Sequence, residues 1–215
     1  MRTLTVETST HGRVLIEGAA VASSRAGLLL GFHGYGQSAE DMLAELQRVP
    51  GHEGWTLVSV QALHPFYARN EERVIASWMT RQDRDLAIAD NVAYVDRVVD
   101  AVRASGSPQA GPIIFLGFSQ GAAMAYRAGV LGRHRAAGIV ALGGDIPPDV
   151  KQADAGPFPR LLIGAGDSDF WYTPAKLDAD VHWLASREIP VDVVRYQGGH
   201  VWTDEFRAAV GTWLG

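Results

Sequence analysis

The chain has 215 residues, of which 47% are apolar, and this suits one domain spanning residues 1–215 with a large core. Its formal charge is −5, and its 19 basic side chains are scattered, which argues against nucleic acid and anionic membranes as partners. No cysteine is present, so disulfides, thiolate metal ligands and a cysteine nucleophile are excluded.

The first residues alternate between polar and apolar types and contain no uninterrupted apolar stretch typical of a signal peptide. Apolar runs elsewhere are strand-sized, well short of the ~20 residues that cross a bilayer. We therefore expect a cytoplasmic protein without stable membrane insertion. The segments 4–8 and 13–18, separated by a turn at 10–12, predict an antiparallel hairpin.

From residue 28 onward, predicted strands and helices alternate. The expected strands are 28–33, 55–61, 112–116, 137–142, 160–164 and 191–196, and the expected helices are 39–48, 83–104, 122–131, 174–186 and 203–214. Residues 62–80 are predicted to run over the surface, and residues 143–159 to form a proline-bearing loop. This alternation predicts an α/β fold with a mostly parallel sheet covered by helices on both faces. In such a sheet, functional residues lie just after the strands.

A Gly-x-Ser-x-Gly motif, Gly117 to Gly121, stands between a predicted strand and a predicted helix. The pattern alone is a weak signal in a chain with 24 glycines, but this strand–turn–helix context is the one that a nucleophilic serine requires. Ser119 is therefore the predicted nucleophile. The amide of Gln120, at the start of the helix, is placed to donate to a developing oxyanion.

A serine nucleophile needs a base, commonly a histidine oriented by a carboxylate. Among seven histidines, His200 is the one that follows the last predicted strand, directly after two glycines. For the acid, Asp169 is favoured over Asp167, which lies two residues before it, and Asp145 is a third candidate. The chain order Ser…Asp…His does not separate these three.

The early strand ends in His33, Gly34, Tyr35 and Gly36. We expect the Tyr35 amide to supply a second oxyanion donor, and His33 to fix this loop by hydrogen bonds rather than act as a base.

Several aromatic residues lie near the predicted acid and base. Trp171, Tyr172 and Trp202 are the preferred candidates for an apolar substrate pocket, and Phe66, Tyr67 and Trp78 are others. No histidine pair has metalloprotease spacing and no dinucleotide fingerprint is present, so neither a metal nor an organic cofactor is expected.

Together these motifs resemble the phospholipase/carboxylesterase family of α/β-hydrolases, which includes bacterial carboxylesterases and acyl-protein thioesterases. The matching segments are residues 32–36, 117–121, 141–144, 166–169 and 199–200. The resemblance implies an α/β-hydrolase fold, Ser119 as nucleophile, Asp169 as acid, His200 as base, and oxyanion donors at Tyr35 and Gln120. Family members often carry Val-Pro shortly after the acid, whereas residues 170–174 here form a longer aromatic segment, which leaves the acyl-chain preference open.

The expected activity is hydrolysis of a small-molecule carboxylic ester through an acyl-enzyme. The alternatives are a thioesterase or lysophospholipase, an aminoacyl peptidase, or a non-catalytic binding module with the same fold. A homodimer is compatible with the sequence, which does not determine the oligomeric state.

Overall fold

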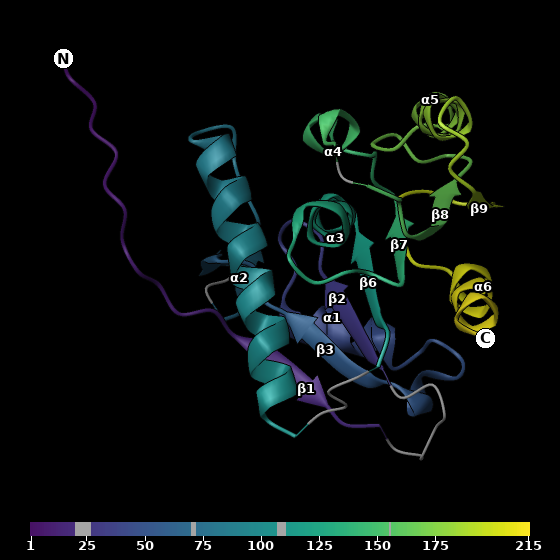
Figure 1. Cartoon of the computed structure of the whole chain (residues 1–215), viewed down its shortest axis with the longest axis horizontal. Coiled ribbons are helices and arrows are strands. Elements are labelled where there is room, and N and C mark those ends of the chain that lie inside the picture. Colours follow the sequence, from purple (N-terminus) through teal and green to yellow (C-terminus); the bar gives the residue numbers. More distant parts are fainter. Residues whose placement is uncertain (20–26, 70–71, 107–110, 155) are drawn as a thin grey trace.

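The computed structural model describes residues 1–19, 27–69, 72–106, 111–154 and 156–215. Its main element is a seven-stranded sheet in the order β1-β3-β2-β6-β7-β8-β9 (Figure 1). The strands are β1 (Val14–Glu17), β2 (Leu28–Phe32), β3 (Thr56–Val60), β6 (Ile113–Phe118), β7 (Gly138–Leu142), β8 (Arg160–Gly166) and β9 (Val191–Tyr196). All neighbouring strands are parallel except β1 and β3, so the expected mostly parallel sheet is confirmed.

Helices cover both faces of the sheet, as the alternation of elements predicts (Figure 1). They are α1 (Ala39–Leu46), α2 (Arg84–Ala104), α3 (Gln120–Leu131), α4 (Pro148–Gln152), α5 (Pro174–Ala185) and α6 (Asp204–Leu214), with a short 3-10 turn η1 (His52–Gly54). Successive residues of β2 belong to different hydrophobic clusters. The cluster of Leu29 includes residues of α1 and α6, and the cluster of Leu30 includes residues of α2, α3 and α5. Central strands buried on both sides explain the continuous apolar runs in the sequence.

The predicted N-terminal hairpin is wrong in its pairing. β1 forms within the expected segment 13–18, but its antiparallel partner is β3, with Val14 opposite Val60 and Glu17 opposite Leu57. Residues 4–8 form no strand, and Leu4 and Val6 are exposed. A lone two-stranded hairpin is only marginally stable, whereas β1 gains hydrogen bonds by extending the edge of a large sheet.

Two segments expected to be irregular contain regular elements. The 62–80 segment forms an antiparallel pair, β4 (His64–Tyr67) and β5 (Val74–Ser77), with residues 70 and 71 outside the described part. Trp78, directly after β5, is fully buried in the core rather than at the surface. The 143–159 segment contains α4, which begins at Pro148, a residue well suited to the first turn of a helix.

β9 forms one edge of the sheet and pairs with β8 alone among the described strands. Most of its side chains are exposed or half-buried. Among the described helices, none has the combination of length and apolar character needed to cross a bilayer.

Candidate active site

Ser119 lies in a strained turn between β6 and α3, with φ 56° and ψ −119°. The two glycines of its motif are required by close backbone contacts. A Cβ at position 117 would lie 2.1 Å from the carbonyl oxygen of Gly121, and one at position 121 would lie 2.0 Å from that of Phe32. Strand and helix can therefore approach only without these side chains, and the turn between them presents the serine at the carboxyl end of β6.

Three side chains from distant parts of the sequence meet in one hydrogen-bonded row. His200 Nε2 lies 2.8 Å from Ser119 Oγ, and His200 Nδ1 lies 2.7 Å from Asp169 Oδ2. A carboxylate can only accept, so Nδ1 carries the proton and Nε2 is free to accept from the serine hydroxyl. This tautomer allows the imidazole to take the serine proton.

Asp169 is buried and oriented by the main chain that follows it. Its Oδ1 accepts from the amides of Trp171 at 2.8 Å and Tyr172 at 2.9 Å, which leaves Oδ2 for His200. The carboxyl group therefore has a fixed orientation and a full set of donors.

The other two acid candidates lie outside this row. Asp167 is exposed, and its Oδ1 accepts from the Gly198 amide at 3.0 Å and the Ser168 hydroxyl at 2.8 Å. These two hydrogen bonds lower the pKa of Asp167, the amide of Gly198 contributing most. Asp167 thus holds the turn that leads to His200. Asp145 is exposed and is not among the hydrogen-bond partners of His200.

The imidazole of His200 is enclosed by groups from two other strand ends. The ring of Phe118 lies 4.9 Å away, centroid to centroid. Gly143, at φ +65°, approaches so closely that a Cβ there would lie 3.0 Å from His200 Cε1. Sequence reasoning did not assign Gly143 to the site, although the pair Gly143-Gly144 directly after a strand was a usable signal.

The loop after β2 lies against the serine, because a Cβ on Gly34 would be 3.3 Å from Ser119 Cβ. Its Gly34 amide donates to Gln37 Oε1 at 2.7 Å, and its Gly36 amide donates to the Ala76 carbonyl at 3.0 Å. Among the described residues, no acceptor pairs with the Tyr35 amide between them. The Gln120 amide, in the first turn of α3, likewise has no helical partner. Both amides are available to an anionic oxygen.

His33 is buried beneath this loop. Its Nδ1 donates to the Gly34 carbonyl at 2.8 Å, and its Nε2 accepts from the Ala62 amide at 3.1 Å. Burial lowers the pKa of His33. The ring is neutral in this arrangement, because Nε2 accepts a hydrogen bond from an amide. The prediction that His33 fixes the loop by hydrogen bonds is confirmed.

The three aromatic candidates for a substrate pocket differ in position. Trp171 is exposed beside Asp169, and the half-buried Trp202 packs 6.2 Å from Phe118, centroid to centroid. Tyr172 was placed wrongly by the sequence prediction: it is 1% exposed, and its hydroxyl donates to Asp180 Oδ2 at 2.9 Å within the core. Within this aromatic run Phe170 and Trp171 are both exposed, and only Tyr172 points into the core.

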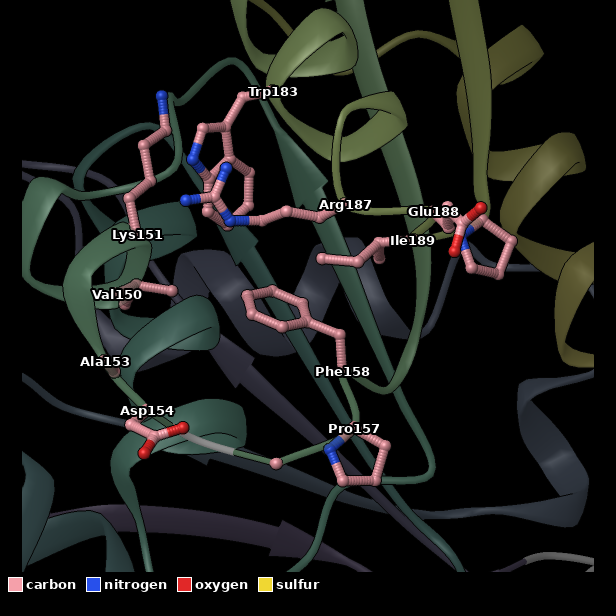
Figure 2. A pocket seen from close by; sticks show the side chains of 12 residues that line it. Val150, Lys151, Ala153, Asp154, Pro157, Phe158, Trp183, Arg187, Glu188 and Ile189 are labelled. Atoms are coloured by element: carbon pink, nitrogen blue, oxygen red, sulfur yellow. The ribbon is translucent and has the colours of Figure 1, made fainter.

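A pocket of about 450 Å³ lies elsewhere, between α4 and α5, and Figure 2 shows its lining, with the Arg187 side chain crossing Trp183. The guanidinium carbon of Arg187 is 4.4 Å from the indole centroid. None of the residues in the Ser119 row contributes to this pocket. Within the described part of the chain, no three His, Asp or Glu side chains are grouped so that they could hold a metal ion.

The chain matches the model of the phospholipase/carboxylesterase family over residues 17–157, more than half of its length. This range contains Ser119, whereas Asp169 and His200 lie beyond it, so their roles are argued from geometry. A search among curated proteins found no significant match.

Solved structures with similar folds include esterases and a thioesterase. The carboxylesterase from Mesorhizobium loti is 26% identical, with a TM-score of 0.73, over 94% of this chain and 93% of that one. The phospholipase/carboxylesterase from Dyadobacter fermentans is 22% identical, with a TM-score of 0.68, over 97% and 98%. The Zea mays acyl-protein thioesterase 2 is 17% identical, with a TM-score of 0.70, over 95% and 100%. The chain therefore belongs to the phospholipase/carboxylesterase family of α/β-hydrolases and is a hydrolase of that family.

Proposed function

We propose that this protein is a carboxylesterase in which Ser119, His200 and Asp169 form the catalytic triad. The observation that carries the proposal is the unbroken row of hydrogen bonds from the serine hydroxyl through the imidazole to a buried carboxylate. Each member follows a different strand, and each sits at the carboxyl edge of the sheet, where ligands bind in this class of fold.

In the first half of the reaction, Ser119 Oγ attacks the ester carbonyl carbon while its proton passes to His200 Nε2. The carbonyl oxygen becomes an oxyanion that accepts hydrogen bonds from the amides of Tyr35 and Gln120. Asp169 stabilises the imidazolium through its hydrogen bond with Nδ1. Collapse of the tetrahedral intermediate breaks the ester C–O bond, and Nε2 returns the proton to the departing alkoxide.

In the second half, water attacks the acyl-serine ester while His200 Nε2 takes a proton from it. The same two amides hold the second oxyanion, and collapse releases the carboxylic acid and restores Ser119 with its proton from Nε2. Every proton transfer uses Nε2 of His200, the nitrogen that stays unprotonated when Nδ1 donates to Asp169.

The test is Ser119→Ala, assayed with p-nitrophenyl esters and with a fluorophosphonate that labels reactive serines. We expect no hydrolysis and no label in this variant, with a melting temperature close to that of the parent chain. Ser186→Ala is the matched control, since this exposed hydroxyl donates to the Trp183 carbonyl in the last turn of α5 and should leave both readouts unchanged. Turnover retained by Ser119→Ala would disprove the nucleophile assignment, and a folded parent chain that takes no label would favour a non-catalytic role.

The leaving group and acyl chain are best assigned by a substrate panel. Tyr35, in the loop that lies against the serine, and Trp171, next to Asp169, are exposed and offer an apolar surface to an acyl or alkyl group. We expect p-nitrophenyl esters with several acyl carbons to be hydrolysed faster than the acetate. Thioesters and aminoacyl anilides assayed in parallel distinguish the ester reaction from the thioesterase and peptidase alternatives.

A further inference from the structure

The side chain of Gln120 contacts a segment that also holds the opposite side of the candidate site. Gln120 directly follows Ser119 and begins α3. Its Oε1 accepts from the Trp78 amide at 2.9 Å and lies 3.3 Å from the Ser77 hydroxyl, and its Nε2 donates to the Met79 carbonyl at 2.9 Å. An amide N–H only donates and a carbonyl only accepts, so these partners fix the orientation of the side-chain amide.

The segment that Gln120 holds includes the end of β5, and β5 is hydrogen-bonded through Ala76 to the loop after β2. One residue earlier, Ala76 exchanges two main-chain hydrogen bonds with that loop, accepting from Gly36 at 3.0 Å and donating to Gln37 at 2.9 Å. The indole of Trp78 adds a third link, since its Nε1 donates to the His33 carbonyl at 2.9 Å. Residues 76–79 therefore bind the Tyr35 loop on one side and the Gln120 side chain on the other.

This arrangement connects the two amides that would receive the oxyanion. The Tyr35 amide lies within the loop held by Ala76, and the Gln120 amide belongs to the residue whose side chain holds Ser77, Trp78 and Met79. The fully buried Trp78 gives residues 76–79 a fixed place in the core. A shift of this segment would move one donor relative to the other.

We propose that the Gln120 side chain is a positioning residue, which acts through residues 76–79 to set the separation of the two oxyanion donors. This inference rests on the proposed function, because it assumes that the two amides stabilise the oxyanion. It assigns the side chain of Gln120 a role separate from that of its main-chain amide. It also gives a role to the β4–β5 pair, which links the first and central parts of the chain.

The experiment replaces Gln120 with methionine, which keeps the length of the side chain and the main-chain amide but removes both polar atoms. Loss of a whole oxyanion donor lowers kcat by about 10²–10³. A displaced donor should cost less, and we expect kcat for a p-nitrophenyl ester to fall roughly tenfold to 100-fold, with KM changed less than about twofold. The inhibition constant of a phenylboronic acid, which forms a tetrahedral adduct with serine, should rise by a similar factor.

Asp96→Ala is the matched control for loss of stability. The Asp96 carboxylate accepts from the Arg133 amide at 2.9 Å, just beyond the opposite end of α3, so its loss disturbs the same helix far from the donors. The inference is overturned if Gln120→Met keeps parental kcat and boronate affinity, or if it loses no more of either than Asp96→Ala. It is also overturned if the loss appears in KM alone. Fluorophosphonate labelling of the parent chain separates the two proposals. An unlabelled parent chain would contradict the triad itself, whereas a labelled parent chain with unchanged kinetics in Gln120→Met would contradict only the positioning role.

Discussion

Replacing Asp169 with asparagine should change which nitrogen of His200 carries the proton. The oxygen Oδ1 of Asp169 accepts from the amides of Trp171 and Tyr172, which can only donate. An asparagine at this position would keep its carbonyl oxygen on those two amides and turn its NH2 group toward His200 Nδ1. Nδ1 must then act as an acceptor, and the proton moves to Nε2, which faces Ser119 Oγ.

The size of the effect follows from the loss of the base. With a proton on Nε2, the imidazole cannot take the serine proton, although the ring stays in place. The same substitution in a well-characterised Ser-His-Asp hydrolase lowers kcat by about 10⁴, equivalent to ~5 kcal/mol of transition-state stabilisation. Because the hydrogen-bond geometry here forces the same tautomer, we expect a loss of that order for Asp169→Asn.

The assay is hydrolysis of a p-nitrophenyl ester, with Asp167→Asn as the matched control. Asp167 holds the turn before His200 through exposed hydrogen bonds, each worth about 1 kcal/mol, so its loss should lower kcat less than about tenfold. Melting temperatures show whether both variants remain folded. If Asp169→Asn keeps more than about a tenth of the parental kcat, or if Asp167→Asn is the more damaged variant, the tautomer argument fails.

Three further predictions concern stability. Ser119→Gly relieves a backbone conformation that costs about 1–3 kcal/mol, so it should raise the melting temperature by a few degrees while abolishing turnover. An unchanged or lower melting temperature would contradict the strain. Tyr172→Phe removes a donor from the buried Asp180 carboxylate and should lower the free energy of unfolding by about 1–3 kcal/mol in urea titrations, so a change below about 0.5 kcal/mol would count against it. Burial lowers the pKa of His33 below its ordinary 6.5. Near that pH the unfolded state binds a proton at this histidine and the folded state does not, so the free energy of unfolding should fall as the pH drops through that value. His33→Gln should make this decline shallower between about pH 7.5 and about pH 5.5, and an equal decline in both proteins would disprove the contribution.

The parts of the fold that could be predicted are those determined by local sequence. β9 occupies the predicted residues 191–196, and the central strands follow from apolar runs bounded by glycines. The turn at Ser119 was readable because its two glycines are a steric requirement. A motif of this kind leaves a trace in the sequence because substitution of either glycine would produce a clash with backbone atoms.

The parts that could not be predicted depend on contacts between distant segments. Residues 4–8 alternate like a strand, but a strand also needs a partner. The segment expected to pair with them, β1, pairs with β3 instead. Composition likewise does not reveal that Tyr172 points to Asp180. The sequence favoured Asp169 over Asp167 but left both open, and the folded turn shows that Asp169 faces the imidazole.

The position of β9 at the edge of the sheet affects the conditions under which the enzyme should lose activity. The imidazole follows this outermost strand, whereas the nucleophile follows β6, which has neighbours on both sides. Edge segments with exposed side chains open at lower free energy than the centre of a fold. Warming or mild denaturant should therefore separate the His200 imidazole from Ser119 while the rest of the molecule stays folded. The loss of activity would then be reversible and would precede melting.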